Sequence, residues 1–225
     1  MNGSNQFPVL SRSALSYDVI VVGHLKWNPY FNERAESPPR GDPSTCTSTL
    51  ICGLDGQGEA YRLLVDVTLR QSAEDYYFDL NRRTGLLPND ITHCFITHAH
   101  FDHQIGVNYF PRAIWMAAKP IAEELRDSTH IDGKKVIGVE GEFLPGVYAY
   151  PLPGHTAGLH GIAFECDKLR IVVAGDGVMT KNHLIHNTSM FEFDSAQAAE
   201  TLRQLKDVAD LIIPGHDNVI INHRM

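Results

Sequence analysis

Short apolar runs separated by polar, glycine-rich turns recur along most of the chain, and this pattern predicts strands. The expected strands are Tyr17–Gly23, Thr49–Cys52, Tyr61–Val67, Ile91–Thr97 and Ala113–Ala117, followed by Val147–Tyr150, Gly161–Cys166, Arg170–Ala174 and Leu211–Ile213. The turn Gly53-Leu54-Asp55-Gly56 lies between two of these runs, so we expect a hairpin there.

Three segments carry helical patterns instead. Ser72–Arg83 begins with a capping serine and acidic residues and ends with two arginines, as helix termini favour. Pro120–Arg126 has proline in its first turn, and Asp194–Val208 places its apolar residues on one face. Strand-rich halves with helices between them predict an α/β fold in which two sheets pack face to face under outer helices.

The remaining segments lack such periodicity. Residues 1–14 are polar and predict a flexible N-terminal arm, which leaves 15–225 as a single domain. Asn28–Thr45 contains four prolines and few aliphatic residues, so we expect a long loop of the kind that often serves function.

Composition restricts the classes of partner. The chain has 225 residues, 43% of them hydrophobic and 20% charged, as in ordinary soluble enzymes. Its formal charge of −8, with no cluster of lysine and arginine, argues against a nucleic-acid partner. The four cysteines form no CxxC pair, which favours buried free thiols in a reducing compartment. Without an apparent secretory signal or an apolar stretch of membrane-spanning length, we expect a cytoplasmic protein that binds no membrane.

Candidate chemistry concentrates in the run Thr97-His98-Ala99-His100-Phe101-Asp102-His103, which directly follows an apolar strand-like segment. Three further candidate ligands, His155, Asp176 and His216, each follow a glycine at a turn. Imidazole and carboxylate groups bind zinc and other divalent first-row metals. Five histidines and two aspartates are enough ligands for two metal ions.

The spacing divides these residues into two sets. Side chains alternate in an extended segment, so His98 and His100 point the same way, whereas Asp102 and His103 lie past a turn. We expect one site of His98, His100, His155 and Asp176, and another of Asp102, His103, His216 and Asp176. At a separation of roughly 3.5–4 Å, two metals would share a bridging hydroxide as nucleophile, and Asp102 would act catalytically by shuttling its proton. The competing interpretations are unrelated surface histidines and a structural zinc site; the absence of cysteine ligands argues against the latter.

These motifs, together with Gly154-His155-Thr156, Gly175-Asp176 and Pro214-Gly215-His216-Asp217, resemble those of the metallo-β-lactamase fold superfamily. The resemblance extends from about Tyr17 to His216 and implies a four-layer αβ/βα sandwich. It also implies that Asp66, at the end of a strand, is a buried support beneath the metals.

Within that superfamily the chain is most similar to small N-acyl homoserine lactonase-like members. True β-lactamases lack an aspartate at the position of Asp176, and we expect none of the extra segments that mark the RNA-processing, glyoxalase II and flavodiiron branches. The lactonases carry a tyrosine three residues after the bridging aspartate, where this chain has Met179. His183 or His186 could replace that tyrosine as a donor, although solvated loop histidines are the simpler interpretation.

The resemblance implies a dinuclear metal-dependent hydrolase that acts on a small ester, lactone or related carbonyl substrate. Zinc is the expected metal, and iron or manganese would also suit the ligands. The alternatives are a phosphodiester or phosphotriester hydrolase with the same centre, a mononuclear iron persulfide dioxygenase, and a silent binding module. A homodimer is possible. The expected substrate contacts, which could instead be core or dimer residues, are Trp27, Tyr30, Phe31, Met179, His183 and Phe191, with Phe101 also near the cleft.

Overall fold

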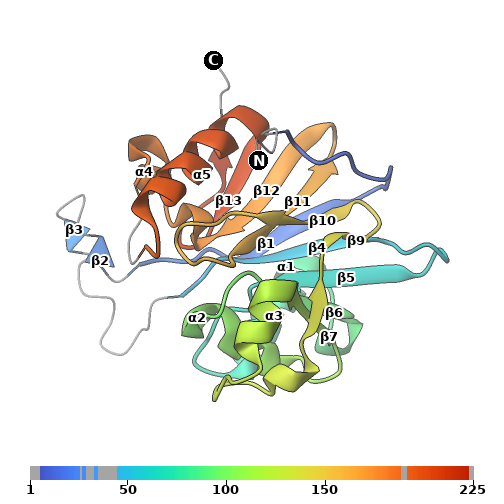
Figure 1. Ribbon diagram of the computed structural model, residues 1–225. Helices are drawn as coiled ribbons and strands as arrows, with labels where there is room; N and C mark the ends of the chain where they lie inside the picture. The colour runs from blue at the N-terminus through green and yellow to red at the C-terminus, as the bar shows by residue number, and fades with distance from the viewer. Residues whose placement is uncertain (1–5, 26, 29–32, 35–44, 189–191, 223–225) are drawn as a thin grey trace.

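The computed structural model describes residues 6–25, 27–28, 33–34, 45–188 and 192–222 (Figure 1). Of the expected substrate contacts, Tyr30, Phe31 and Phe191 lie outside these residues, as does the side chain of Trp27. The two short strands β2 (Trp27–Asn28) and β3 (Glu33–Arg34) pair antiparallel within the segment expected to be a loop.

One six-stranded sheet is formed mainly by the first half of the chain. Its strand order is β1-β4-β5-β6-β7-β8. The first three strands pair antiparallel, and β5 to β8 run parallel. The strands are β1 (Ser16–Val21), β4 (Ser48–Leu54), β5 (Ala60–Val65), β6 (His93–Ile96), β7 (Ile114–Ala118) and β8 (Ile137–Val139).

The second half of the chain forms the other six-stranded sheet, in the order β14-β13-β12-β11-β10-β9. Here β12 and β13 are parallel and the remaining neighbours are antiparallel. The strands are β9 (Gly141–Leu144), β10 (Val147–Pro151), β11 (His160–Cys166), β12 (Leu169–Gly175), β13 (Leu211–Pro214) and β14 (Ile220–Ile221).

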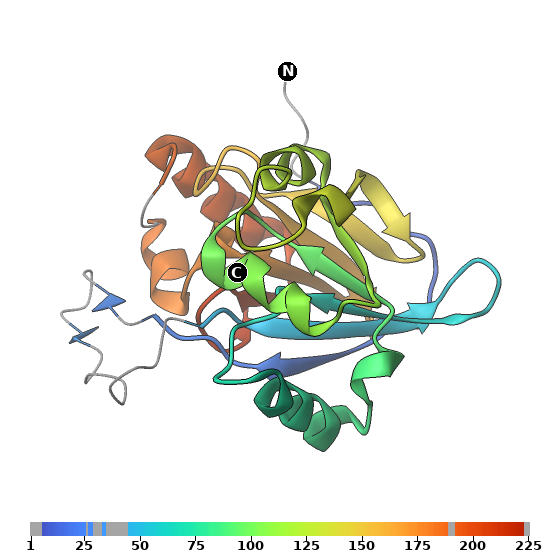
Figure 2. The same ribbon diagram turned by 90° about the horizontal axis from the view of Figure 1, so that it is seen from below.

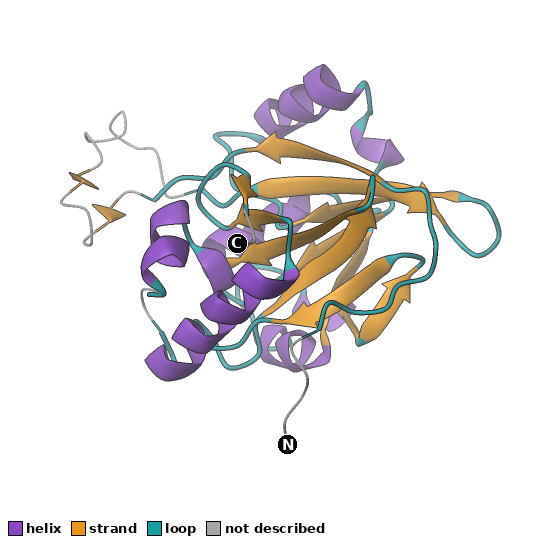
Figure 3. Ribbon diagram, turned by 90° about the horizontal axis from the view of Figure 1, so that it is seen from above, coloured by secondary structure: helices purple, strands orange, loops and turns teal. Residues whose placement is uncertain are grey.

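Alternation along the strands produces the layers. Leu63 and Val65 of β5 join a buried cluster shared with β12, while Leu64 between them faces the outer helices of its own sheet. In β12, Val173 faces the other sheet and Val172 faces outward. The sheets therefore pack face to face with helices outside both, which confirms the predicted αβ/βα sandwich (Figures 1 and 3).

The helices are α1 (Ala73–Thr84), α2 (Phe101–Gln104), α3 (Lys119–Leu125), α4 (Lys181–His186) and α5 (Ser195–Val208). Ser72 caps α1 in a capping box with Asp75, and Gly85 ends it in the left-handed conformation. Asp194 caps α5 by accepting from the Gln197 N–H. The Ser72 cap confirms the sequence prediction, and Asp194 begins the predicted second helix, although its capping role was not predicted. None of the described helices combines the length and apolar character needed to cross a membrane.

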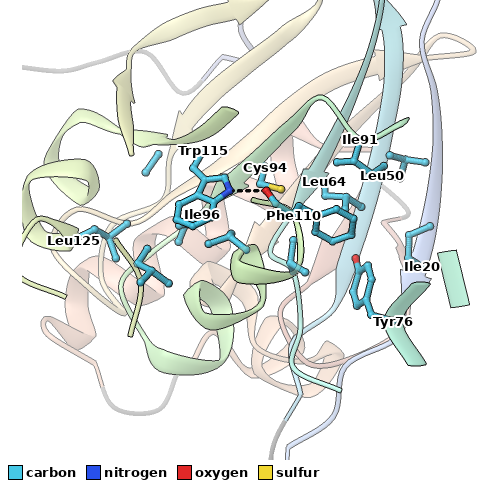
Figure 4. Packing of buried hydrophobic residues seen from close by; sticks show 14 of the residues in the cluster. Ile20, Leu50, Leu64, Tyr76, Ile91, Cys94, Ile96, Phe110, Trp115 and Leu125 are labelled. Carbon is cyan, nitrogen blue, oxygen red and sulfur yellow. Dashed lines mark hydrogen bonds between the residues drawn. The ribbon is translucent and has the colours of Figure 1, made fainter. Parts of the chain in front are cut away.

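Helices α1 and α3 cover the outer face of the first sheet. Figure 4 shows this packing, in which Tyr76 of α1 and Leu125 of α3 lie against side chains from the strands. The buried Trp115 donates its indole N–H to the Phe110 carbonyl at 3.0 Å, so its one polar atom is satisfied. Seen from below, α1 and α3 lie at opposite ends of the view, with α2 between them (Figure 2).

Several helices and strands were not predicted from the sequence. The short strands β8 and β9 and the short helices α2 and α4 were not expected, because each spans six residues or fewer. Residues 6–15 form neither helix nor strand, but they contact the second sheet through the Ser11 N–H, which donates to Glu142 at 3.1 Å. Flexibility of the arm and the single-domain boundary at residue 15 stay predictions.

Candidate metal centre

Strand β6 delivers the histidine-rich run to one edge of the sandwich. After β6, residues 97–99 form a bend, and His100, which has extended backbone angles, is the N-cap of α2. Asp102 and His103 therefore project from the first turn of a helix, whereas His98 and His100 precede it. This change of conformation divides the run into two directions, as its spacing predicts.

The other candidate ligands reach the same edge from the second sheet. Asp176 follows β12, His216 follows β13, and His155 lies in the loop after β10. These three strands run in one direction, so their carboxyl ends meet at a single edge. Candidate ligands more than a hundred residues apart in sequence thereby converge.

The first ligand group consists of His98, His100, His155 and Asp176, whose candidate donor atoms all lie within 4.8 Å of one another. Oδ2 of Asp176 lies 3.4 Å from Nε2 of His155 and 3.8 Å from Nε2 of His98. Nδ1 of His100 is 3.0 Å from Nε2 of His155. His98 is fully buried, whereas His100 is exposed at the surface.

The second ligand group consists of Asp102, His103 and His216, again with donor atoms within 4.8 Å. Oδ2 of Asp102 lies 3.7 Å from Nε2 of His216 and 4.0 Å from Nε2 of His103. Both histidines are buried, while the Asp102 side chain is 24% exposed and forms the open side of the group.

Asp176 lies between the two groups. Its Oδ1 atom is 3.1 Å from Nε2 of His216 and 3.2 Å from Nε2 of His103, while Oδ2 faces the first group. Gly215 permits this approach, because a Cβ atom there would collide with the Asp176 carboxylate. One carboxylate therefore presents a different oxygen to each group.

Hydrogen bonds from outside the groups orient the imidazole rings. Asp66 is buried, and its carboxylate accepts from the Thr97 N–H at 2.9 Å, the Thr97 hydroxyl at 2.8 Å and Nδ1 of His103 at 2.8 Å. Nδ1 of His216 donates to the Thr45 carbonyl at 3.0 Å, and Nδ1 of His98 pairs with the Thr97 hydroxyl. With each Nδ1 bonded outward, Nε2 of these rings points to the centre.

The φ angle of Asp66 is 51°, an uncommon conformation for a residue other than glycine. Such strain persists only where its surroundings hold it in place. The three donors to its carboxylate provide that restraint, so its position beneath the ligands agrees with the support that the sequence resemblance implies.

The two groups differ in electrostatics. Burial lowers the pKa of His98 well below its ordinary value, and burial together with the neighbouring His155 lowers the pKa of His100. Burial alone would also lower the pKa of His103 and His216, but the Asp176 carboxylate and other negative neighbours raise both. Burial opposes ionisation of Asp176, yet the adjacent His216 and His103 hold its pKa well below the ordinary value.

Within the described part of the chain, some buried polar atoms of the centre meet no partner in hydrogen-bonding geometry, although other candidate ligands approach them closely. They are Nε2 of His98, Nε2 of His103 and Oδ1 of Asp176, three of the donor atoms of the two groups. Leaving such atoms unsatisfied is costly, and buried polar atoms in proteins are almost always paired. Nitrogen and oxygen donors converging without partners are what divalent metal ions require, so the residues present fit metal binding.

A cavity of about 350 Å³ opens beside the first group. His100, Phe101 and Gln104 form one side, and Leu125 with residues 127–130 form the other. Phe101 is 45% exposed, and its ring meets that of His130 edge-on. Apart from His100 and Phe101, the sequence pattern did not single out this lining, because its polar loop residues resemble any solvated turn.

His183 corrects one interpretation of the sequence. It is not a solvated loop histidine: it is fully buried in α4, where Thr180 caps the helix and pairs with Nδ1 of His183 at 2.7 Å. Burial lowers the pKa of His183 to about 4, so its ring is neutral. His186 is exposed. A substrate contact by His183 stays a prediction.

Met179 is almost fully buried, and its carbonyl accepts the His216 N–H at 2.8 Å. The described contact supports the backbone of a candidate ligand. The expected contact between its side chain and a substrate stays a prediction. Thr45 and Thr97, which orient ligands directly, were missed, because single threonines carry no local signal of such a role.

Comparison with known proteins agrees with this geometry. The chain is 28% identical over 161 residues to an N-acyl homoserine lactonase of a Bacillus species, an alignment that covers 66% of this chain and 64% of that protein. The match thus spans slightly less than two thirds of the relative's length.

Among solved structures, an N-acyl homoserine lactone hydrolase with the product N-hexanoyl-L-homoserine at its catalytic metal centre superposes with a TM-score of 0.60 and 18% identity, covering 93% of this chain and 94% of that one. AidC, a dizinc quorum-quenching lactonase, superposes with a TM-score of 0.57 and 15% identity, covering 72% and 68%. At these identities the structures show a shared fold. The profile of the Metallo-beta-lactamase superfamily matches residues 41–216, and the chain therefore belongs to that superfamily.

Proposed function

We propose that this chain is a metal-dependent hydrolase with a dinuclear centre that acts on a small ester, lactone or related carbonyl substrate. The observation that carries the proposal is the position of Asp176, whose two oxygens face two separate sets of histidines. A single metal ion would need only one of those sets. Two sets sharing one carboxylate are typical of a pair of metals.

The chain's own residues have two roles, as candidate metal ligands and as groups that orient those ligands. Five histidines with Asp102 and Asp176 would hold the ions, while Asp66 and the Thr45 carbonyl keep two rings in the required orientation. Bound ions would supply Lewis-acid polarisation of a substrate carbonyl and a strongly acidified water. Asp102 is the most solvent-accessible of the described carboxylates at the centre, so it is suited to hold or pass a proton there.

The charge around the centre favours a neutral carbonyl substrate over a phosphate ester. In the described residues, the ion pairs made by Asp66, Asp102 and Asp176 come from histidines, with no lysine or arginine taking part. Phosphate recognition normally uses arginine or lysine. Relatives described as lactonases also support a lactone or ester.

Zinc is the proposed metal, since imidazole-rich sites with carboxylates suit it and one similar structure is a dizinc lactonase. Iron and manganese can occupy the same ligands. A small-molecule substrate follows from the proposed chemistry. The cytoplasmic location, the possible homodimer and the absence of a nucleic-acid partner stay predictions.

The test combines metal analysis with a substrate panel on metal-reconstituted protein. The proposal expects two ions per chain and turnover of lactones or esters that a chelator abolishes and zinc, manganese or iron restores. Turnover of phosphotriesters or phosphodiesters alone would contradict the proposed substrate class and assign the protein to the phosphoester hydrolases. A single iron ion with persulfide oxidation, or two bound ions with no turnover across the panel, would overturn it.

A further inference from the structure

Three consecutive residues, Thr45 to Thr47, connect the second ligand group to the rest of the fold. The Thr45 carbonyl accepts from Nδ1 of His216 at 3.0 Å. The Thr47 N–H donates to the Gly215 carbonyl, and its hydroxyl donates to the Asp217 carbonyl at 3.1 Å. The backbone on both sides of Cys46 is therefore attached to the loop that carries His216.

Cys46 itself reaches in the opposite direction, to the segment that carries the other ligands of this group. Its Sγ atom lies 3.1 Å from the carbonyl oxygen of Asp102 and 3.9 Å from that of Asp66. A carbonyl oxygen can only accept, so the thiol is the donor, and the shorter distance assigns its one proton to Asp102. Cys46 is fully buried, so no solvent competes for this contact.

The contacted helix is held at His103, whose Nδ1 donates to Asp66, and at Gln104, whose amide donates to the Ala99 carbonyl, and Cys46 adds a contact at Asp102. Helix α2 comprises only Phe101–Gln104, and its N-cap, His100, makes no capping hydrogen bond through its side chain. Asp102 and His103 lie in that first turn, so a small rotation of the turn moves two candidate ligands together. A short helix without a side-chain cap depends on contacts with its surroundings for its position.

We propose that Cys46 is a positioning residue for the second ligand group, whose buried thiol holds the backbone of Asp102 and so sets where the Asp102 and His103 side chains meet His216. It touches neither substrate nor metal. The inference rests on the proposed metal centre, and it assigns to a thiol in the core a role in metal affinity that packing alone does not require.

Variants at two cysteines separate this role from general packing. Cys46→Ala and Cys46→Val remove the donor, the second with less loss of volume, and Cys46→Ser retains a donor. Cys94→Ala is the matched control, because Cys94 is equally buried but belongs to the cluster between the first sheet and its helices. Metal affinity is measured by competition with a chromogenic chelator, together with the visible spectrum of the Co²⁺ protein, the melting temperature and kcat/KM.

The proposal expects Cys46→Ala and Cys46→Val to weaken binding of one of the two ions about tenfold, the lower end of what loss of an outer support costs, with an altered Co²⁺ spectrum. Cys46→Ser should recover most of that affinity, and Cys94→Ala should match the wild type in affinity and spectrum even if its melting temperature falls. Wild-type affinity in both donorless variants, or an equal loss in Cys94→Ala, would overturn it. Wild-type protein that binds two ions but hydrolyses nothing would refute the proposed function, while the affinity comparison still decides the role of Cys46.

Discussion

The first and second ligand groups hold the same kinds of side chain in different electrostatic surroundings. Around His98 and His100, burial and neighbouring imidazoles favour neutral rings. Around His103 and His216, carboxylates outweigh burial and favour protonated rings. In the metal-free protein the first group is therefore ready to accept a cation at neutral pH, whereas the second must release protons first.

The two groups also differ in how they are supported. His103 is oriented by the carboxylate of Asp66 and His216 by a backbone carbonyl, both buried and remote in sequence. In the first group, His98 is oriented by the hydroxyl of its neighbour Thr97, and His100 pairs directly with His155. The difference lies in the partners: His103 and His216 are each oriented by a group outside the candidate ligands and remote in sequence, whereas His98 is oriented by its neighbour and His100 contacts another candidate ligand.

The largest effect should come from removing one ligand of each group. His103→Ala and His98→Ala should each lose one metal ion and reduce kcat/KM by at least about 100-fold, because loss of an outer support alone can cost that much. Metal content and hydrolysis rates measure the result, with the exposed His186→Ala as the control. A His103→Ala protein with near wild-type rate would contradict a two-metal mechanism.

A smaller effect should follow Asp66→Asn. Oδ2 of Asp66 is shared by the Thr97 hydroxyl and Nδ1 of His103, and an amide nitrogen there could no longer accept. We expect affinity at the second group to fall about 10- to 100-fold and affinity at the first to change less. Chelator competition measures both, and Asp55→Asn, in an exposed turn, is the control. Equal losses of metal affinity at both groups would show that Asp66 does not support the second group selectively.

The pH dependence of metal binding should differ between the groups. A metal ion displaces protons from His103 and His216, whose pKa values are raised, so affinity there should increase with pH by about tenfold per unit for each proton released. His98 and His100 have lowered pKa values, so these two rings should release few protons and add little pH dependence at the first group near neutrality. Titrations at about pH 6, 7 and 8 test this. Equal slopes of log affinity against pH for the two ions would contradict this difference between the groups.

The smallest effect concerns the cavity beside the first group. Phe101 is about half exposed there, so Phe101→Ala should remove ~1 kcal/mol of apolar contact with a substrate and raise KM about fivefold, with kcat and metal content unchanged. Steady-state kinetics with esters of increasing size measure it. Phe78→Ala, on α1 and away from the cavity, is the control; Phe78 is even more exposed than Phe101, and its loss should leave KM as it was. A KM that is insensitive to Phe101 would place the substrate elsewhere.

Sequence reasoning was most successful where the signal is local. The caps Ser72 and Asp194 begin helices α1 and α5, and the apolar strand before Thr97 leads directly into the histidine run. The order of strand-like and helical segments in the two halves also predicted two sheets packed face to face under outer helices. Such signals depend on neighbours within a few positions, so they survive in the sequence alone.

Three features could be recognised only in the folded structure. His183 is buried only because Thr180 starts a short helix that turns it inward, and α2 and the edge strands β8 and β9 are too short to leave a periodic pattern. The cavity lined by residues 127–130 forms where a loop meets α2, a contact that composition does not reveal.

The order and identity of the candidate metal ligands were determined by the sequence itself, because imidazole and carboxylate chemistry is a property of each side chain. Tertiary structure alone decided which oxygen of Asp176 meets which histidines, and that Thr45, Cys46 and Asp66 hold the ligands from behind. The physical reason is separation: Thr45 and His216 lie 171 positions apart, and only the packing of the two sheets brings them within hydrogen-bonding distance.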